Sequence, residues 1–291
     1  LYSAQQLRQS LRRVIQDCDP KGEDPALDQM VLVGHSMGGV LAKLMTQHSD
    51  DELWRQIANR PVEQLQALPQ EKEMIERVYF YEPQPYVRRV IFLATPHRGS
   101  QLSEKPIGRL VSRLISLPTV VVKTRDDLIA RNPGVFNENF QEKMPTSVDN
   151  LAPDSPVIQA TARLKMAPGV VSHTIMGNLY DVEPKLGSDG IVPYASSHLE
   201  EAESEFVVKS GHNCHTHPLA VLEVRRILLE HLDQIEKQKN SSGLQPASHQ
   251  SETKDAPPSA APAAAVRPRT SRELIPPKPL GPNEVSLELS R

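Results

Sequence analysis

Four short, mostly apolar runs are spread along the chain and predict buried strands. They are Met30–Val33, Val87–Leu93, Val170–Met176 and Phe206–Lys209. Short apolar runs of this kind are typical of parallel strands that are covered on both faces. Segments with helical spacing lie between them, so the pattern predicts an α/β fold with a mostly parallel sheet flanked by helices.

Two amphipathic segments frame this predicted sheet. The first, Ser3–Cys18, begins with a capping box formed by Ser3 and Gln6. Its apolar face comprises Ala4, Leu7, Leu11, Val14, Ile15 and Cys18. The second runs from about Pro218 to Ile235, with proline at its first position. Its predicted buried stripe comprises Val221, Val224, Leu228, Leu232 and Ile235.

The segment directly after the first strand carries the most informative motif. It reads Gly-His-Ser-Met-Gly, with Ser36 at its centre, and a helical apolar pattern follows. Strand, tight turn and helix in this order predict that Ser36 occupies a strained turn with its hydroxyl above the sheet edge. We expect Gly34 and Gly38 to be required because strand and helix approach closely there. The Met37 N–H, at the helix N-terminus, is then placed to stabilise an oxyanion.

The segment Gly34–Gly39 resembles the lipase and esterase branch of the α/β-hydrolase superfamily. The resemblance covers about residues 1–236 and implies the α/β-hydrolase fold, with nucleophile, acid and base in that chain order. A further segment, Thr95-Pro96-His97-Arg98-Gly99-Ser100, is similar to the Thr-Pro-His-x-Gly-Ser segment of many lipases. The resemblance implies that His35, Thr95 and His97 line the wall of the site. His97 is also the weaker alternative for the base.

Two later loops contain the acid and the base that the resemblance implies. The loop after the third predicted strand includes Asp189, followed by glycine and then by Ile-Val-Pro. Asp189 is therefore the predicted acid, with Asp181 as the weaker competitor. His212 follows the fourth strand after Ser-Gly, which makes it the predicted base, and His217 is the alternative.

The histidines near the last strand also raise the question of a metal site. His212, Cys214, His215 and His217 lie close together, and zinc prefers nitrogen and sulfur ligands. Their spacing matches no familiar structural zinc pattern, and His212 is already predicted to act as the base for Ser36. We therefore predict no metal ligands and no cofactor.

Together, these residues predict a serine hydrolase that cleaves carboxylic esters. Ser36 would attack the ester carbonyl while His212 takes its proton, and an acyl-enzyme would form. The same residues would serve an acyltransferase, a thioesterase or an amidase, and a hydrolase-like domain can also act as a non-catalytic binding scaffold. The expected partner is a small-molecule or lipid ester, with peripheral contact to a lipid surface as a further option.

Composition separates a domain-sized region from a C-terminal tail. The 291-residue chain has a net charge of −3 and no basic stripe, which argues against a nucleic-acid partner. Its two cysteines are too few for a disulfide framework, and no apolar run is long enough to span a bilayer. Insertions at about 49–86 and 101–168 are predicted to form a lid or cap. Residues 237–291 are rich in Pro, Ala and Ser, which predicts a disordered tail after a domain of residues 1–236.

The chain begins at Leu1, at the start of an amphipathic helix, and not at a methionine. The family places a strand and a loop with a second oxyanion N–H before this helix, and neither is in the sequence. We therefore expect the natural protein to extend further at its N-terminus, and we assign it no compartment.

Overall fold

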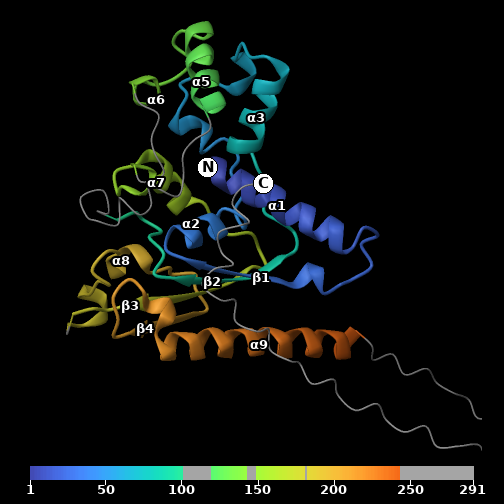
Figure 1. Ribbon diagram of the computed structural model, residues 1–291, viewed down its shortest axis with the longest axis vertical. Coiled ribbons are helices and arrows are strands. Elements are labelled where there is room, and N and C mark those ends of the chain that lie inside the picture. The colour runs from blue at the N-terminus through green and yellow to red at the C-terminus, as the bar shows by residue number, and fades with distance from the viewer. Residues whose placement is uncertain (101–118, 143–148, 181, 243–291) are drawn as a thin grey trace, which may run out of the picture. The chain divides into compact units, whose positions relative to one another are not determined.

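The computed structural model describes residues 1–100, 119–142, 149–180 and 182–242 (Figure 1). The chain divides into two units, Leu1–Leu244 and Gln245–Arg291, and all described residues lie in the first. Within it, four strands form a parallel sheet in the order β1-β2-β3-β4. They are β1 (Met30–His35), β2 (Val87–Leu93), β3 (Val171–Gly177) and β4 (Ser204–Val208). The four predicted strands and their parallel pairing are thus confirmed.

Helices connect the strands, as parallel pairing requires. They are α1 (Tyr2–Cys18), α2 (Met37–Lys43), α3 (Pro69–Tyr79), α5 (Thr119–Arg131), α6 (Glu138–Glu142), α7 (Pro156–Arg163), α8 (Tyr194–Ser197) and α9 (Pro218–Ser242). Short 3₁₀ turns are η1 (Leu27–Gln29), η2 (Trp54–Gln56), η3 (Val62–Gln64), η5 (Asp149–Leu151), η6 (Pro184–Leu186) and η7 (Cys214–Thr216). Among the described residues, no helix combines the length and the apolar character needed to cross a bilayer.

The two faces of the sheet carry different helices (Figure 1). Successive side chains of a strand point to opposite faces. Ile91 and Leu93 of β2 pack with Ile227 of α9 on one face. Val90 and Phe92 pack with side chains of α1 and α2 on the other. The sheet is therefore covered on both faces, which explains why the apolar part of β2 is a continuous run in the sequence.

The N-terminal helix differs from its prediction in two respects. α1 begins at Tyr2 and no side chain caps it, so the predicted capping box of Ser3 and Gln6 is wrong: Ser3 already lies in the first turn. Its fully buried side chains are Ala4 and Arg8, whereas Val14, which was predicted to be buried, is 54% exposed. An arginine can be buried here because backbone carbonyls of two other helices accept its hydrogen bonds.

The C-terminal helix continues to Ser242, beyond its predicted end at Ile235. Residues 237–242 are therefore helical, although the sequence predicted the tail to begin there. The first four residues beyond Ile235, Glu236–Lys239, have high helix propensity and favour this extension. The remaining residues of the predicted tail, 243–291, lie outside the described part of the chain.

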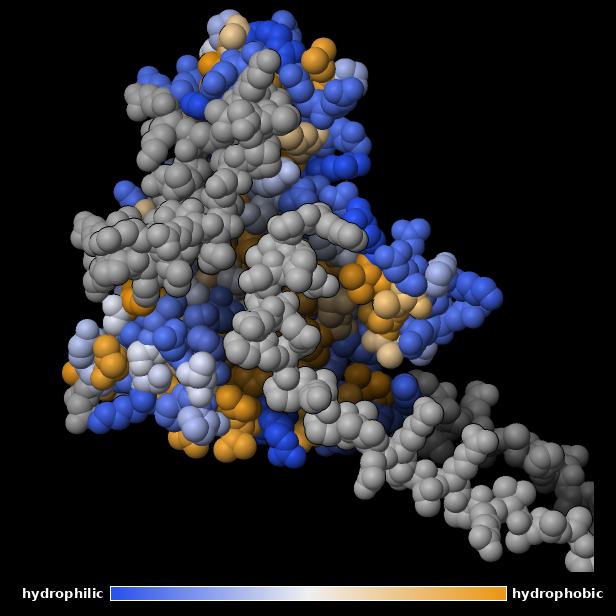
Figure 2. Space-filling view, in the orientation of Figure 1, coloured by the Kyte–Doolittle hydropathy of each residue, from blue (hydrophilic) through white to orange (hydrophobic). Residues whose placement is uncertain are grey.

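The sequence placed the buried face of α9 only in part: Val224 packs against the core as predicted, whereas Val221, Leu228 and Leu232 are exposed. Its buried side chains include Ala220, Ile227 and His231. Its exposed apolar side chains are Leu219, Val221, Leu222, Leu228, Leu229 and Leu232, which gather at the surface over α9 in Figure 2. Apolar residues occur on several sides of this helix, so their spacing did not distinguish the stripe that faces the sheet. His231 also lies on the inner side, and its ring donates a hydrogen bond to the carbonyl of Gln29.

The two predicted insertions pack against each other. Trp54, Ile57 and Ile75, from the first insertion, form one apolar cluster with Leu128 and Phe136 from the second. The second insertion is described only in part, since residues 101–118 and 143–148 lie outside the described residues. The role of these segments as a lid stays a prediction.

Candidate active site

The turn between β1 and α2 places Ser36 in a strained backbone conformation. Ser36 has φ 54° and ψ −126°, in a region that residues with a side chain rarely adopt. Its N–H donates a hydrogen bond to the carbonyl of Leu93 at 2.8 Å, which ties the turn to the end of β2. The strained turn that the sequence predicted is therefore present, at the carboxyl edge of the sheet.

Two glycines allow β1 and α2 to approach each other, but they are not the pair that was predicted. A Cβ on Gly34 would lie 2.5 Å from the Cα of Gly39. A Cβ on Gly39 would lie 1.9 Å from the hydroxyl oxygen of Thr95, whereas a Cβ on Gly38 would meet nothing within 4 Å. The prediction for Gly34 is confirmed, and the prediction for Gly38 is wrong because a Cβ at that position would enter open space.

The ring of His212 lies between Ser36 and Asp189. Its Nε2 is 2.9 Å from the Ser36 hydroxyl oxygen, and its Nδ1 is 2.8 Å from Asp189 Oδ2. A carboxylate oxygen can only accept, so Nδ1 carries the proton and Nε2 accepts from the Ser36 hydroxyl. The side chains of His212 and Asp189 are only 10% and 2% exposed, so little water competes for these bonds.

The loop after β3 orients Asp189 toward His212. Asp189 Oδ1 accepts the backbone N–H groups of Ile191 and Val192 at 2.8 and 2.7 Å, which leaves Oδ2 for the histidine. Gly190 has φ 89°, a left-handed conformation that glycine adopts without strain. The weaker competitor, Asp181, lies outside the described residues.

His35 contacts the backbone of the segment that carries His212. Its Nε2 donates a hydrogen bond to the His212 carbonyl at 2.9 Å, and its ring centroid is 4.1 Å from that of His215. Burial, with the neighbouring His215 and His212, lowers the pKa of His35, so its ring is neutral. The sequence predicted that His35 lines the wall of the site. It did not predict the hydrogen bond to the His212 carbonyl, because the two residues are 177 positions apart in the sequence.

The remaining predicted site residues lie apart from this hydrogen-bonded set. Thr95 is buried against Gly39, beneath the turn. His97 is 2% exposed and packs edge-on against Phe92, and burial holds its pKa well below the usual range. The ring of His217 accepts the N–H of Leu219 at 3.3 Å, at the start of α9. Among the described residues, neither His97 nor His217 forms a hydrogen bond with Ser36 or Asp189.

His212, Cys214 and His215, which were considered as metal ligands, have other surroundings in the structure. Cys214 is buried, and burial raises the pKa of its thiol to about 11. His212 and His215 face different partners, Asp189 and His35 respectively. In the described part of the chain, no group of three or more His, Cys, Asp or Glu side chains is placed to hold a metal ion.

Two apolar cavities adjoin each other, and the smaller one borders the helix that follows Ser36. The smaller, of about 60 Å³, is lined by Met37 and Val40 of α2 among others. The larger, of about 130 Å³, is lined by Trp54 and Phe136 among others. Both also contact Val157, so the two cavities are neighbours. Apolar space thus begins at the residue next to Ser36.

The chain has the α/β-hydrolase fold. Its parallel sheet carries a strand, a serine turn and a helix in direct succession, and loops after β3 and β4 carry Asp189 and His212. The three residues follow in the chain order that this fold uses.

No protein-family model matches the sequence, and no curated protein matches it. Among solved structures, it is similar to Bacillus licheniformis lipase BlEst2 in mature form, with 18% identity, a TM-score of 0.33, and coverage of 72% of this chain and 65% of that chain. It is also similar to phospholipase PlaB from Legionella pneumophila, with 18% identity, a TM-score of 0.33, and coverage of 67% and 33%. For Staphylococcus hyicus lipase the identity is 14% and the TM-score 0.38, with coverage of 72% and 71%. The chain thus spans less than two thirds of the length of the first two.

Proposed function

We propose that this chain is a serine hydrolase of carboxylic esters, of the carboxylesterase or lipase type. One observation carries the proposal: the His212 ring is hydrogen-bonded to Ser36 through Nε2 and to Asp189 through Nδ1. Nucleophile, base and orienting acid in this arrangement form the constellation that activates a serine hydroxyl. It is assembled at the carboxyl edge of the sheet, where ligands bind in open α/β folds.

In the proposed mechanism, Ser36 Oγ attacks the ester carbonyl carbon and His212 Nε2 takes its proton. The imidazolium that forms is stabilised by Asp189, which stays ionised. Collapse of the tetrahedral intermediate breaks the bond to the alcohol, and His212 returns the proton to the leaving oxygen. Water then attacks the acyl-serine with the same histidine as base, and the carboxylic acid is released.

The oxyanion of the intermediate would be stabilised by the N–H of Met37. This residue is at the first position of α2, where no preceding helical turn can accept its N–H. The helix dipole also favours negative charge at this end. A preorganised backbone donor of this kind contributes about 10²–10³ in turnover in other serine hydrolases.

The cavity beside Met37, together with its larger neighbour, supports a preference for esters with an apolar acyl group. Their linings are mostly aliphatic and aromatic, so an alkyl chain would replace water there without losing hydrogen bonds. A small-molecule or lipid ester would therefore be the substrate.

Labelling of the full chain with a fluorophosphonate, in parallel with hydrolysis of p-nitrophenyl esters, tests the proposal. Ser36→Ala should lose both labelling and hydrolysis and keep the circular dichroism spectrum. Ser10→Ala, at an exposed serine of α1, is the matched control and should behave like the wild type. Labelling that persists in Ser36→Ala at another serine would refute the assignment.

A further inference from the structure

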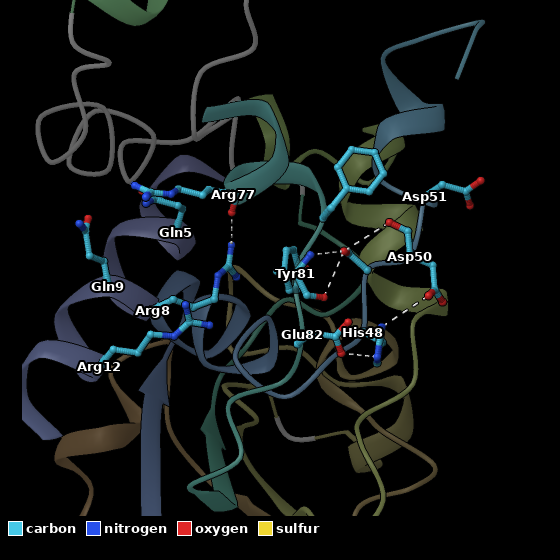
Figure 3. A pocket seen from close by; sticks show the side chains of 12 residues that line it. Gln5, Arg8, Gln9, Arg12, His48, Asp50, Asp51, Arg77, Tyr81 and Glu82 are labelled. Carbon is cyan, nitrogen blue, oxygen red and sulfur yellow. Dashed lines mark hydrogen bonds and ion pairs between the residues drawn. The ribbon is translucent and has the colours of Figure 1, made fainter. Parts of the chain in front are cut away.

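A third cavity, larger than the two apolar ones, lies at the opposite end of α2 from Ser36. Its volume is about 760 Å³, which suits a small organic ligand. It is bounded by α1, by the turn at residues 48–51 and by the C-terminal end of α3 with the residues that follow (Figure 3). Four side chains at helical spacing along one side of α1 line it: Gln5, Arg8, Gln9 and Arg12. None of the three residues of the proposed mechanism is among its lining.

Arg8 places a buried positive charge in the wall of this cavity. It is 4% exposed, and its guanidinium lies over the Tyr81 ring, 3.9 Å from the centroid. Its Nη1 and Nη2 groups donate to the carbonyls of Leu44 and Arg77, at the C-terminal ends of α2 and α3, at 3.5 and 3.3 Å. The partial negative charge at these helix ends and the aromatic face hold the cation. No described carboxylate forms an ion pair with it.

Arg12 lies one helical turn after Arg8 in α1. Like Arg8, it donates its hydrogen bond to a neutral group and not to a carboxylate. Its Nε donates to Oε1 of Gln84 at 3.0 Å, and Gln84 is itself buried. Among the described residues it has no carboxylate partner either. Arg8 and Arg12 are close enough that Arg12 contributes, after burial, to lowering the pKa of Arg8 to about 10. Two guanidinium groups thus repel each other at the cavity wall, and no carboxylate in the described part of the chain is paired with either.

The opposite wall is acidic. Figure 3 shows Tyr81 between the two arginines of α1 and a group formed by His48, Asp50 and Glu82. His48 forms ion pairs with both carboxylates, so this group keeps a negative charge even when the histidine is protonated. Of the other charged residues in the lining, Arg77 is paired with Glu73, and Asp51 with Arg55.

We propose that this cavity binds a small zwitterionic phosphate, with its phosphate group on Arg8 and Arg12 and its cationic group toward Asp50 and Glu82. Guanidinium groups bind phosphate oxygens through paired hydrogen bonds, and two of them match the charge of a phosphate monoester. A carboxylate would leave one arginine without a partner. A nucleotide triphosphate or a nucleic acid would bring negative charge to the acidic wall, so the arrangement disfavours polyanions.

Titration calorimetry of the full chain with phosphoethanolamine, inorganic phosphate and ethanolamine tests this site. Phosphoethanolamine should bind more tightly than either half alone. Arg12 is exposed, so Arg12→Gln should fold normally and weaken binding of phosphoethanolamine roughly tenfold or more, the loss expected for a charge-assisted hydrogen bond. Arg13→Gln, at an exposed arginine outside the lining, is the control and should bind like the wild type.

A second variant separates the two walls of the cavity. Glu82→Gln should weaken phosphoethanolamine binding and leave inorganic phosphate binding unchanged, because only the cationic end of the ligand faces Glu82. Equal affinities in Arg12→Gln and Arg13→Gln, or phosphoethanolamine binding no tighter than ethanolamine binding, would overturn the proposal. Ester hydrolysis should be unchanged in all three variants, so the two proposals can fail independently.

The source of the phosphate is decided by flotation with vesicles of phosphatidylethanolamine. Flotation of the wild type that is lost in Arg12→Gln supports a lipid headgroup as the ligand. If phosphoethanolamine binds in calorimetry in a manner that depends on Arg12, but the protein does not float with the vesicles, the ligand is a free phosphate ester.

Discussion

The His35 ring donates a hydrogen bond to the backbone carbonyl of His212, at 2.9 Å and across 177 residues of sequence. It connects the residue before Ser36 to the residue whose Nε2 accepts from the Ser36 hydroxyl. Because the lowered pKa keeps His35 neutral, its single ring proton is on Nε2. We infer that this bond holds the base segment at the correct distance from the serine.

Replacing His35 should therefore lower turnover without changing substrate affinity. We expect His35→Phe, which lacks the donor, to reduce kcat roughly three- to tenfold, the cost of one neutral hydrogen bond, with KM nearly unchanged. His35→Gln keeps an N–H donor and should retain most of the activity. His217→Phe is the control, because the His217 ring accepts the N–H of Leu219 at the start of α9. Equal losses in the Phe and Gln variants at position 35 would show that the hydrogen bond is not what matters.

Asp189→Asn should separate structure from catalysis. The asparagine oxygen can still accept the N–H groups of Ile191 and Val192, so the loop and the melting temperature should be preserved. Its amide would donate to Nδ1 of His212 and shift the ring proton to Nε2, which then cannot accept from Ser36. We expect kcat to fall roughly 10⁴-fold, as in other serine triads. Asp154→Asn, at an exposed aspartate, serves as the control, and a modest loss at position 189 would contradict the role of Asp189.

Gly38 and Gly39 form a matched pair for testing the packing of α2 on the sheet. Gly39→Ala forces a Cβ into the side chain of Thr95 and should lower the free energy of unfolding by about 1–3 kcal/mol. Gly38→Ala meets open space and should be neutral or stabilising by up to about 1 kcal/mol, because alanine favours helix. Denaturant titration of both variants measures this difference. Similar destabilisation by both would mean that Thr95 does not limit the approach.

His173 should make the fold sensitive to acid. Its ring is fully buried, Arg89 donates to its Nε2, and its Nδ1–H donates to Ser204 Oγ at 2.7 Å. Burial, followed by the charge of Arg89, lowers its pKa from 6.5 to about 4. Between pH 6.5 and about pH 4, His173 is therefore protonated in the unfolded chain and neutral in the folded chain. The free energy of unfolding should fall as the pH decreases from about 6.5 to about 4, by about 3 kcal/mol at most from this residue.

Urea denaturation at about pH 7 and about pH 4.5 checks this prediction. His173→Gln can still accept from Arg89 but does not titrate, so its stability should depend less on pH than that of the wild type. An equal loss of stability in the two proteins would assign the acid sensitivity to other groups.

The sequence alone determined those features that depend on neighbouring residues. The strand before Ser36 and the strained turn at Ser36 were predicted because an apolar run, glycines and a helical pattern follow each other within a few residues. Ser36, Asp189 and His212 were predicted to act together from their positions after successive strands. Parallel strands end at one edge of the sheet, so residues that follow them meet there without any long-range information.

Only the tertiary structure decided which sides of these elements face the interior. Gly39, rather than Gly38, is constrained because the loop after β2 brings Thr95 against it. α9 is apolar on several sides, and the packing of Ala220, Val224 and Ile227 against the sheet decides which side faces inward. Arg8 is buried because carbonyls from two separate helices and the Tyr81 ring converge on its guanidinium. Such choices depend on groups brought together from distant segments, and the periodicity of one helix contains no information about them.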